Sequence, residues 1–312
     1  MKPDLSVILC SHNPRPDYLR RAIGALKQQT LPLARWEFLI IDNLSSPPIE
    51  SLCESGWHSD CRILVESDLG ILPARVRGLE ESRADHILFL DDDNVLAPDY
   101  LELALRIGND RPFLGAWGGG RIHLEYETPP PSWIKEFEYL FTDLDLKEEQ
   151  WAKMGLGNPV MPPTMGMCLR RVVADQFLES VKRDPRRKLL GRKGKKQFSN
   201  CEDNDLALTA CDLGFGTGQF PQMALAHLIP ATRLEADYVF SLYEGTVQSA
   251  YILQALRGRP PVPDRLSAAR RWIGRMRRKF FFDPILARMT ECRLRARQQA
   301  CEVVAQWQSV AQ

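Results

Sequence analysis

The chain of 312 residues contains no run of about 18 consecutive apolar residues, so we expect no membrane-spanning helix. Neither the G-x-S-x-G pattern of serine hydrolases nor the G-x-x-x-x-G-K-[ST] pattern of phosphate-binding loops occurs in it. Its eight cysteines form no C-x-x-C pair, and its five histidines have no spacing typical of a zinc site. Free thiols, together with first residues that do not resemble a secretory signal, favour a cytoplasmic protein.

An excess of charge of one sign is also absent, because 41 Lys and Arg residues balance 40 Asp and Glu residues and the formal net charge is +1. This balance hides a basic end. Residues 264–301 hold 11 basic and 3 acidic residues, a local charge of +8, so the preceding part of the chain is acidic. The proline-rich stretch 257–263 predicts a linker before this end. We therefore predict a basic helical extension over residues 258–312.

The basic extension mixes arginines with Trp272 and the phenylalanines at 280–282. Such a composition suits an interfacial helix against anionic lipids, which would place the protein peripherally at the inner membrane surface. Docking onto the body or onto a second subunit is the alternative, since Ile273, Met276 and Phe280 fall at helical spacing. No recognisable fold or aromatic platform supports nucleic-acid binding, and the oligomeric state is not indicated.

Short apolar runs alternate with amphipathic segments in the first half of the chain. The runs are residues 5–10, 36–41, 62–65 and 86–90, and helical patterns cover residues 17–29 and 72–84. Continuous apolar strands that alternate with helices are typical of a parallel sheet covered on both faces. The second half is less regular. Its expected elements are strands at 113–117, 121–124, 165–169 and 218–227, a glycine turn at 118–120, and helices at 133–154, 171–181, 200–213 and 237–256.

Polar side chains follow the first four predicted strands, at the points where the strands end. In open α/β sheets, ligands bind beyond the carboxyl ends of the strands. We therefore expect these polar groups to meet at one edge of the sheet. They are Ser11, His12 and Asn13 after the first strand, Asp42 and Asn43 after the second, Glu66, Ser67 and Asp68 after the third, and Asp91, Asp92 and Asp93 after the fourth.

The aspartate triplet 91–93 is the strongest signal of chemistry. Three adjacent carboxylates repel one another unless a cation or water solvates them, and their hard oxygens suit Mg²⁺ or Mn²⁺ bridging to substrate phosphates. Strand alternation would direct Asp91 and Asp93 to one side and Asp92 to the other. A solvated acidic turn or a helix cap is the alternative interpretation.

Two further candidates lie in the second half. Glu202 and Asp203 begin a predicted helix, where capping and the helix dipole alone favour acids, but a carboxylate presented from such a turn also suits a general base. His227 ends an apolar strand, and a single histidine is more often structural than a ligand. Residues 182–196 hold nine Lys and Arg residues and one Asp, which fits a lid over phosphates or a solvated loop.

The order of these pieces resembles the family 2 glycosyltransferases with the GT-A fold. The resemblance covers about residues 4–257 and depends on SVILCSHN, FLIIDN, ESDLGILPARVRGL, ILFLDDD, GMCLRR, the segment from LLGRKGKK to FGTG, and AHLIPATRL. It implies a GT-A glycosyltransferase domain over 1–257, with a nucleotide-sugar-binding half over 1–110 and an acceptor and catalytic half over 111–257. The resemblance further implies inverting transfer from a nucleoside-diphosphate sugar to a hydroxyl group.

The resemblance also implies roles for individual residues around the donor. Asp42 matches the acid that contacts the nucleotide base, with Ser11 and Asn13 lining the same pocket. Asp68 and Arg75 match positions near the nucleotide and its sugar. The triplet matches the DxD motif, in which Asp91, with Asp92 beside it, would contact ribose or sugar. Asp93 and His227 would hold Mn²⁺ or Mg²⁺ on the diphosphate, and Arg192 would bind phosphate or acceptor.

Glu202 and Asp203 match the ED motif, with Asp203 as the base that deprotonates the acceptor hydroxyl. We expect a UDP-sugar donor and a glycan or lipid-linked acceptor in surface glycan or glycoconjugate synthesis. Two alternatives remain at this stage. A metal-dependent nucleotidyltransferase would need a glycine-rich or lysine-bearing loop after the first strand, where this sequence has SHNPRP. A catalytically silent sugar-nucleotide-binding protein would not need the retained ED pair.

Overall fold

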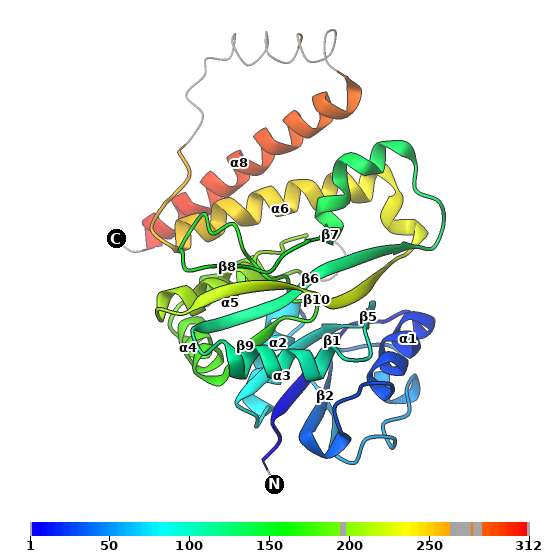
Figure 1. Cartoon of the computed structure of the whole chain (residues 1–312). Coiled ribbons are helices and arrows are strands. Elements are labelled where there is room, and N and C mark those ends of the chain that lie inside the picture. Colours follow the sequence, from blue (N-terminus) through cyan, green and yellow to red (C-terminus); the bar gives the residue numbers. More distant parts are fainter. Residues whose placement is uncertain (1, 194–197, 263–275, 277–282, 311–312) are drawn as a thin grey trace.

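The computed structural model describes residues 2–193, 198–262, 276 and 283–310 (Figure 1). Within these residues a single ten-stranded sheet runs through the molecule, in the order β3-β2-β1-β4-β9-β6-β10-β5, and β7 and β8 pair with β6 and β10. Strands from both halves of the chain therefore belong to one sheet. This mixed α/β architecture agrees with the fold class predicted from the sequence.

The first half forms four neighbouring parallel strands, as the alternation of apolar runs predicts. Most residues of the three inner strands are buried, which explains why they read as continuous apolar runs. The strands are β1 (Leu5–Ser11), β2 (Trp36–Asp42), β3 (Cys61–Val65) and β4 (His86–Asp91), and the helices are α1 (Pro16–Lys27), α2 (Ile71–Glu81) and α3 (Tyr100–Asp110).

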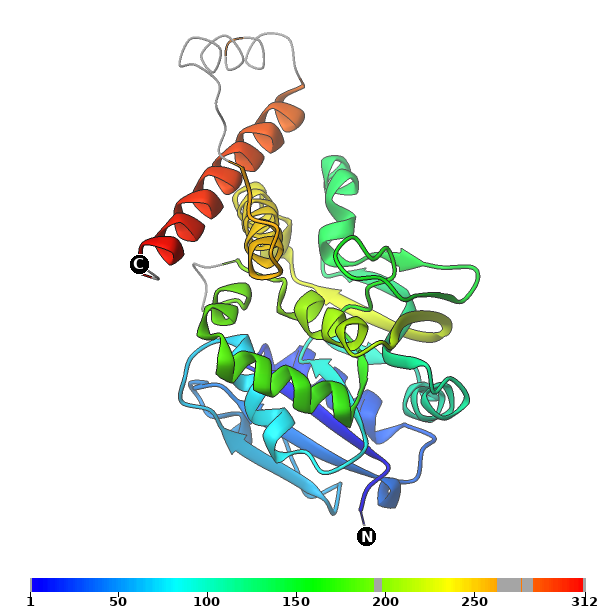
Figure 2. The same ribbon diagram turned by 90° about the vertical axis from the view of Figure 1, so that its left-hand side faces the viewer.

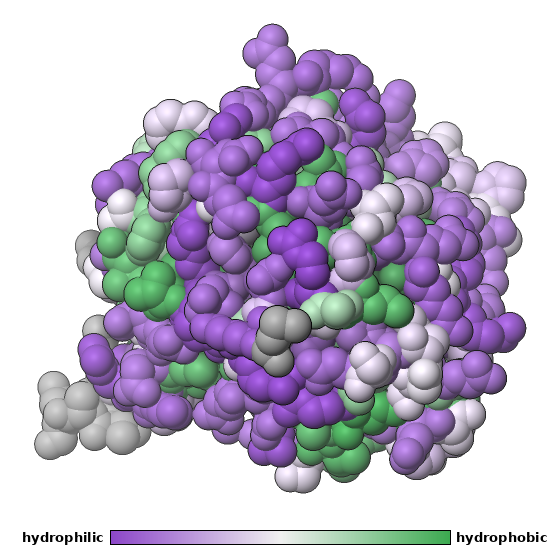
Figure 3. All heavy atoms as spheres, turned by 60° about the horizontal axis from the view of Figure 1, so that its bottom comes forward, coloured by the Kyte–Doolittle hydropathy of each residue, from purple (hydrophilic) through white to green (hydrophobic). Residues whose placement is uncertain are grey.

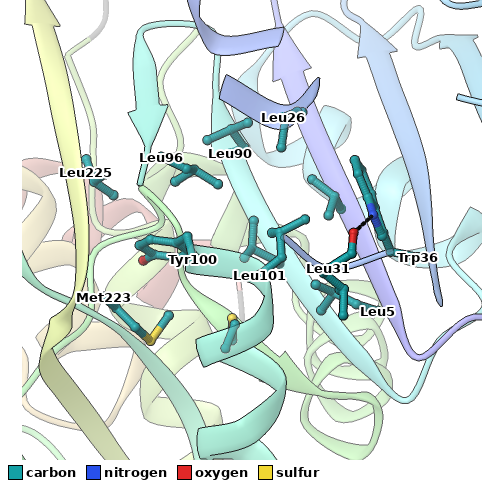
Figure 4. Packing of buried hydrophobic residues seen from close by; sticks show 14 of the residues in the cluster. Leu5, Leu26, Leu31, Trp36, Leu90, Leu96, Tyr100, Leu101, Met223 and Leu225 are labelled. Carbon is teal, nitrogen blue, oxygen red and sulfur yellow. Dashed lines mark hydrogen bonds between the residues drawn. The ribbon is translucent and has the colours of Figure 1, made fainter. Parts of the chain in front are cut away.

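Two hydrophobic clusters lie on opposite faces of this sheet. Leu5, Val7 and Leu9 of β1 point to the cluster that contains α1 and α3, whereas Ile8 and Cys10 point to the cluster that contains α2. This alternation is the period of two expected of a strand covered on both sides. Figure 4 shows part of the first cluster, where the indole Nε1 of Trp36 donates a hydrogen bond of 3.3 Å to the carbonyl of Leu31.

The second half adds β6 and β10, which pair in parallel, and the short antiparallel β9 that joins β6 to β4. The helices α4 and α5 complete the second cluster. The further elements are β5 (Asn94–Leu96), β6 (Leu114–Tyr126), β7 (Leu144–Asp145), β8 (Gln150–Ala152), β9 (Cys168–Arg170), α4 (Arg171–Arg183), α5 (Glu202–Asp212), β10 (Gly216–Ile229) and α6 (Ala236–Leu256), with 3-10 turns at Leu33–Arg35, Ile49–Ser51, Ser132–Phe141 (η3), Pro185–Leu190 (η4) and Ala231–Leu234 (η5).

The glycines at 118–120 do not form the predicted turn, because β6 continues through them. A Cβ atom on Gly119 would lie 2.9 Å from the carbonyl oxygen of Met223, and one on Gly120 would lie 2.7 Å from the carbonyl carbon of Phe220. Both neighbours belong to β10, where the register shifts between Phe220 and Ala224. The glycines therefore permit close packing of two strands rather than a reversal of the chain.

The predicted helix over 133–154 is also wrong in large part. A 3-10 turn, η3, covers Ser132–Phe141, and the rest supplies β7 and β8, which pair with β6 and β10. The partner strands decide this structure, and local periodicity does not contain that information. The helix predicted over 200–213 is α5, which ends at Asp212 and is followed by Gly214 with a left-handed φ of +83°.

The described part of the extension is one long helix, α8 (Pro284–Val310), which packs along α6 (Figures 1 and 2). Cys292, Ala296 and Ala300 of α8 are buried in this contact. Arg288 and Arg295 form ion pairs of 2.6 Å with Asp237 and Glu244 of α6. This part is therefore docked on the body, whereas Trp272 and the phenylalanines at 280–282 lie outside the described residues. Of the helices that the structure describes, none is long and apolar enough to cross a membrane.

The face seen from below Figure 1, where the chain begins, is mostly hydrophilic and carries only separate small apolar areas (Figure 3). The parallel strands start near this face. Their carboxyl ends point the other way, toward the second half of the chain. The polar groups that follow the strands are therefore directed into the molecule's middle, between the two halves.

Candidate active site

A cleft of about 580 Å³ lies beyond the carboxyl ends of the strands. Residues from both halves of the chain line it, so segments that are distant in sequence meet there. Ten of the twelve residues assigned a role from the sequence belong to this lining: Ser11, Asn13, Arg75, Asp91, Asp92, Asp93, Arg192, Glu202, Asp203 and His227.

The aspartate triplet does not alternate as a strand would, because β4 ends at Asp91 and the chain turns. Each carboxylate has a different partner. Asp91 accepts a hydrogen bond of 3.5 Å from Arg75, Asp92 accepts one from the hydroxyl of Ser11, and Asp93 faces His227. All three line the cleft, so the expectation that Asp92 points to the opposite side is wrong. The turn, and not the pleat of the strand, sets these directions.

Arg75 connects the two acidic segments. Its guanidinium is almost fully buried and donates hydrogen bonds of 2.5 Å to Glu202 and 2.7 Å to the hydroxyl of Thr164, besides the contact with Asp91. One cation from α2 thus holds the start of α5 against the end of β4. A buried arginine between two carboxylates offsets the cost of bringing those like charges together.

Burial gives the carboxyl groups of the cleft unusual proton affinities. It raises the pKa of Glu202 to about 7 and that of Asp203 to about 6, although the charge of Arg75 opposes both shifts. Burial and the neighbouring Asp93 raise the pKa of Asp92 to about 7. A carboxylate with a pKa near 6 is ionised at neutral pH and yet more basic than an exposed one, which suits a general base.

Asp93 and His227 lie side by side, with their Oδ2 and Nε2 atoms 3.5 Å apart. Backbone bonds fix them, because Leu228 donates its N–H to the carbonyl of Asp93 at 2.8 Å and β10 pairs with β5 at His227 and Asn94. The Nδ1 atom of His227 is 2.8 Å from the carbonyl oxygen of Phe141 and therefore donates to it. The Nε2 atom thus carries the lone pair.

Arg233 completes this cluster and was not assigned a role from the sequence. Its guanidinium lies 2.9 Å from Oδ2 of Asp93 and 3.2 Å from Nε2 of His227. Although burial alone would raise the pKa of Asp93, the charge of the adjacent Arg233 holds it well below its ordinary value. The only sequence signal for Arg233 is its place six residues after His227 in AHLIPATRL.

The donor set at this cluster fits a divalent cation in part. In the described ranges, no group of three or more His, Cys, Asp and Glu side chains is placed to hold a metal ion. Asp93 and His227 offer one carboxylate oxygen and one imidazole nitrogen, a mixed pair that suits Mn²⁺ better than Mg²⁺, which prefers oxygen ligands. Their separation of 3.5 Å is within the span of about 4 Å allowed by two bonds of about 2.1 Å.

Asp42 and Asp68 are not among the residues that line the cleft. Both carboxylate oxygens of the buried Asp42 accept backbone hydrogen bonds, from Ser45 at 2.8 Å and from Ile49 at 2.9 Å. Asp68 accepts a hydrogen bond of 2.8 Å from Lys188 at the surface. Asn43, which the sequence places with Asp42 after the second strand, lines the cleft and binds the backbone of the loop before α2. In this structure Asp42 therefore shapes its own loop.

The basic segment 182–196 is only partly a loop. Its first residues end α4, η4 follows at Pro185–Leu190, and residues 194–196 lie outside the described part. Arg187 forms an ion pair with the buried Asp205, so this side chain is anchored to the body. Arg192 lines the cleft, and its guanidinium lies 4.9 Å from the centre of the Phe198 ring.

The solved structures that resemble this chain include the crystal structure of S. aureus TarS 1-349 in complex with UDP-GlcNAc. The superposition covers 90% of this chain and 73% of that chain, with a TM-score of 0.51 and 15% sequence identity. At this identity the likeness concerns the fold. It supports a GT-A-type arrangement of the central sheet.

Curated relatives match over shorter stretches. The protein named glycosyltransferase EpsH of Bacillus subtilis is 28% identical over 110 residues, which cover 35% of this chain and 31% of that protein. Glycosyltransferase AglE of Haloferax volcanii is 26% identical over 151 residues, 47% of each chain. The matches thus span less than half of these relatives. The model of the glycosyl transferase family 2 matches residues 6–177, more than half of the chain, and the protein therefore belongs to this family of glycosyltransferases.

Proposed function

We propose that this glycosyltransferase uses a divalent cation and transfers a sugar from a UDP-sugar to a hydroxyl acceptor with inversion at the anomeric carbon. The observation that carries the proposal is the convergence of Asp93, His227 and Asp203 on one cleft. The family match ends at residue 177, before Asp203 and His227, so their placement is independent support.

The chemistry follows from the two acidic clusters. A hydroxyl group is a weak nucleophile until a base takes its proton, and Asp203 lines the cleft with a pKa raised to about 6. Glu202 is held by Arg75 and positions the start of α5. Attack of the deprotonated oxygen on the anomeric carbon breaks the bond to the diphosphate in a single displacement, which inverts the configuration. The proton stays on Asp203 until solvent removes it.

Asp93 and His227 would hold the cation. A bound Mn²⁺ or Mg²⁺ supplies charge neutralisation for the departing diphosphate. The remaining ligands would come from phosphate oxygens and water, as is common for these ions. Asp91, Asp92 and Ser11 stand next to this position in the lining of the cleft and are proposed to contact the ribose or the sugar.

UDP is the proposed nucleotide because the structure of TarS 1-349 in complex with UDP-GlcNAc shares the fold. The acceptor is proposed to be a glycan or a lipid-linked glycan. Phe198 and Tyr238 support this choice, since they line the cleft that Glu202 and Asp203 also line, and sugar rings pack well on aromatic faces. Contact of the basic extension with anionic lipids stays a proposal, tested by liposome sedimentation with and without residues 264–312.

The test begins with a screen of nucleotide sugars by thermal shift, with and without Mn²⁺, followed by detection of released nucleoside diphosphate across acceptor pools. Calorimetry then compares wild type with Asp93→Ala, for which we expect loss of metal-dependent donor binding. Unchanged titration of Asp93→Ala with the metal-loaded donor would refute the metal assignment. Binding of donors without any turnover across the acceptor pools would instead favour a silent sugar-nucleotide-binding protein.

A further inference from the structure

Arg233 stands where a cation bound to Asp93 and His227 would have to stand. Its guanidinium contacts Oδ2 of Asp93 at 2.9 Å and Nε2 of His227 at 3.2 Å. These are the two atoms that offer lone pairs to a metal ion. An arginine cannot give up its proton, so this contact is a fixed positive charge placed against both ligands.

The ligands are fixed while the arginine is not held by the sheet. Asp93 and His227 are fastened by the pairing of β5 with β10 and by the bond from Leu228 to the carbonyl of Asp93. Arg233 lies outside this ladder, in the short turn η5 that follows Pro230. Its guanidinium is carried on a long side chain, so its removal from the ligands needs rotamer changes and no break in the sheet.

We propose that Arg233 occupies the cation position in the donor-free enzyme, so that a divalent ion binds to Asp93 and His227 only by displacing it, and binds tightly only together with the donor. This inference rests on the proposed function. The single lone pair of Nε2 of His227 cannot serve the guanidinium and a divalent ion at once, and the two positive charges would repel each other at the buried Asp93. Metal binding therefore includes the cost of breaking the Arg233 contacts.

The donor offsets this cost. A released guanidinium remains in the lining of the cleft, beside the place of the diphosphate, where it can form paired hydrogen bonds with phosphate oxygens. Metal and nucleotide then strengthen each other's binding beyond their direct contact, and by linkage the coupling is reciprocal. The expected consequence is a free enzyme with low affinity for Mn²⁺ that does not take up the ion before the donor arrives.

The experiment measures the Kd of Mn²⁺ by electron paramagnetic resonance, with and without UDP, for wild type and Arg233→Gln. It is carried out at pH 8, so that the carboxylates remain ionised. Without UDP we expect Arg233→Gln to bind Mn²⁺ about 10- to 100-fold more tightly than wild type, the factor that charged hydrogen bonds are worth. With UDP present, the advantage of Arg233→Gln over wild type in Mn²⁺ affinity should shrink or reverse. The ratio of the Kd of Mn²⁺ without UDP to the Kd with UDP should therefore be smaller in the variant than in wild type.

Matched variants separate this effect from general damage. Arg21→Gln removes an exposed arginine that also binds a carboxylate, that of Glu125 at 2.7 Å, but lies outside the cleft, and it should leave both Kd values unchanged. Arg233→Lys keeps the positive charge, so without UDP its affinity for Mn²⁺ should stay nearly as low as that of wild type. The double variant Arg233→Gln with Asp93→Asn should lose the increase in Mn²⁺ affinity that Arg233→Gln shows. That loss would show that the ion binds at Asp93. Circular dichroism confirms that each variant is folded.

Three results would overturn the inference. Equal Mn²⁺ affinity of wild type and Arg233→Gln without UDP would show that the arginine does not compete. Metal-free binding of UDP that is lost in Arg233→Gln would show that Arg233 itself serves as the cation for the diphosphate. Absence of Mn²⁺ binding in wild type and in all variants, with or without UDP, would refute both the metal site and the proposed metal dependence. The first result would refute only the competition by Arg233 and leave the proposed metal dependence intact.

Discussion

Replacement of Asp203 by asparagine tests the assignment of the catalytic base most directly. Asparagine keeps the shape of the side chain but cannot accept the proton of the acceptor hydroxyl. General base catalysis contributes about 10²- to 10⁴-fold to a rate, so we expect kcat to fall by about that factor. The Kd of the donor with Mn²⁺ should stay the same, because the role proposed for Asp203 is toward the acceptor hydroxyl and not toward the donor.

The same replacement should stabilise the protein at alkaline pH. An exposed Asp titrates at about pH 3.9, whereas burial raises the pKa of Asp203 to about 6. The folded state therefore holds the proton more tightly than the unfolded state. Ionisation of Asp203 then lowers the free energy of unfolding, a loss that begins above about pH 4 and reaches its full size above about pH 6. The neutral amide of the Asp203→Asn variant avoids this cost, so the free energy of unfolding should rise by about 1–3 kcal/mol at pH 8 and show no gain at pH 4.

The assay combines initial rates of nucleoside diphosphate release with thermal unfolding at both pH values. Asp212→Asn is the matched control, because Asp212 ends the same helix, α5, and its side chain is 54% exposed in a surface ion pair with Arg257. It should leave the rate unchanged and alter stability by less than about 1 kcal/mol. An Asp203→Asn protein with near-normal kcat would refute the base assignment. A loss of stability at pH 8 would refute the electrostatic reasoning.

Three further outcomes follow from the same geometry. Transfer by the wild type should decline as the pH falls below about 6, since protonated Asp203 cannot act as a base; a rate that is flat down to about pH 5 would contradict this. Arg75→Met should lower the free energy of unfolding in urea by about 3–5 kcal/mol, because Glu202 and Asp91 lose their buried counterion; an unchanged midpoint would show that water replaces it. Gly120→Ala should cost about 1–3 kcal/mol in the same assay, because its Cβ would lie 2.7 Å from the backbone of Phe220, whereas Gly56→Ala has open space and should be nearly neutral.

Much of the fold was predictable where local pattern and burial agree. The three inner parallel strands β1, β2 and β4 are largely apolar runs because helices cover both of their faces, and their ends were therefore visible as the first polar residues. The glycines at 118–120 were wrongly predicted as a turn, because local pattern does not decide their structure. Their role depends on β10, which lies about a hundred residues further along the chain, and a sequence window does not contain that neighbour.

The site shows the same division. The acids after β4 and at the start of α5 were predictable because clustered carboxylates are costly without a function. Asp42 also lies at a strand end, but both of its carboxylate oxygens accept hydrogen bonds from the backbone of its own loop. These bonds could not be inferred from the sequence. Arg233 was not predicted as a site residue, since an arginine in a short turn is ordinary and only its distance to Asp93 gives it meaning.

The three residues of β9 have a consequence for how the enzyme admits substrates. Cys168–Arg170 pair with β4 on one side and with β6 on the other, so the half that carries Asp91 and the half that carries Glu202 share a continuous backbone ladder. A hinge between the halves would have to break this ladder and separate Arg75 from Glu202. We therefore expect entry of the donor and release of the product to depend on the short turns at the rim of the cleft, while the sheet beneath the cleft keeps its pairing.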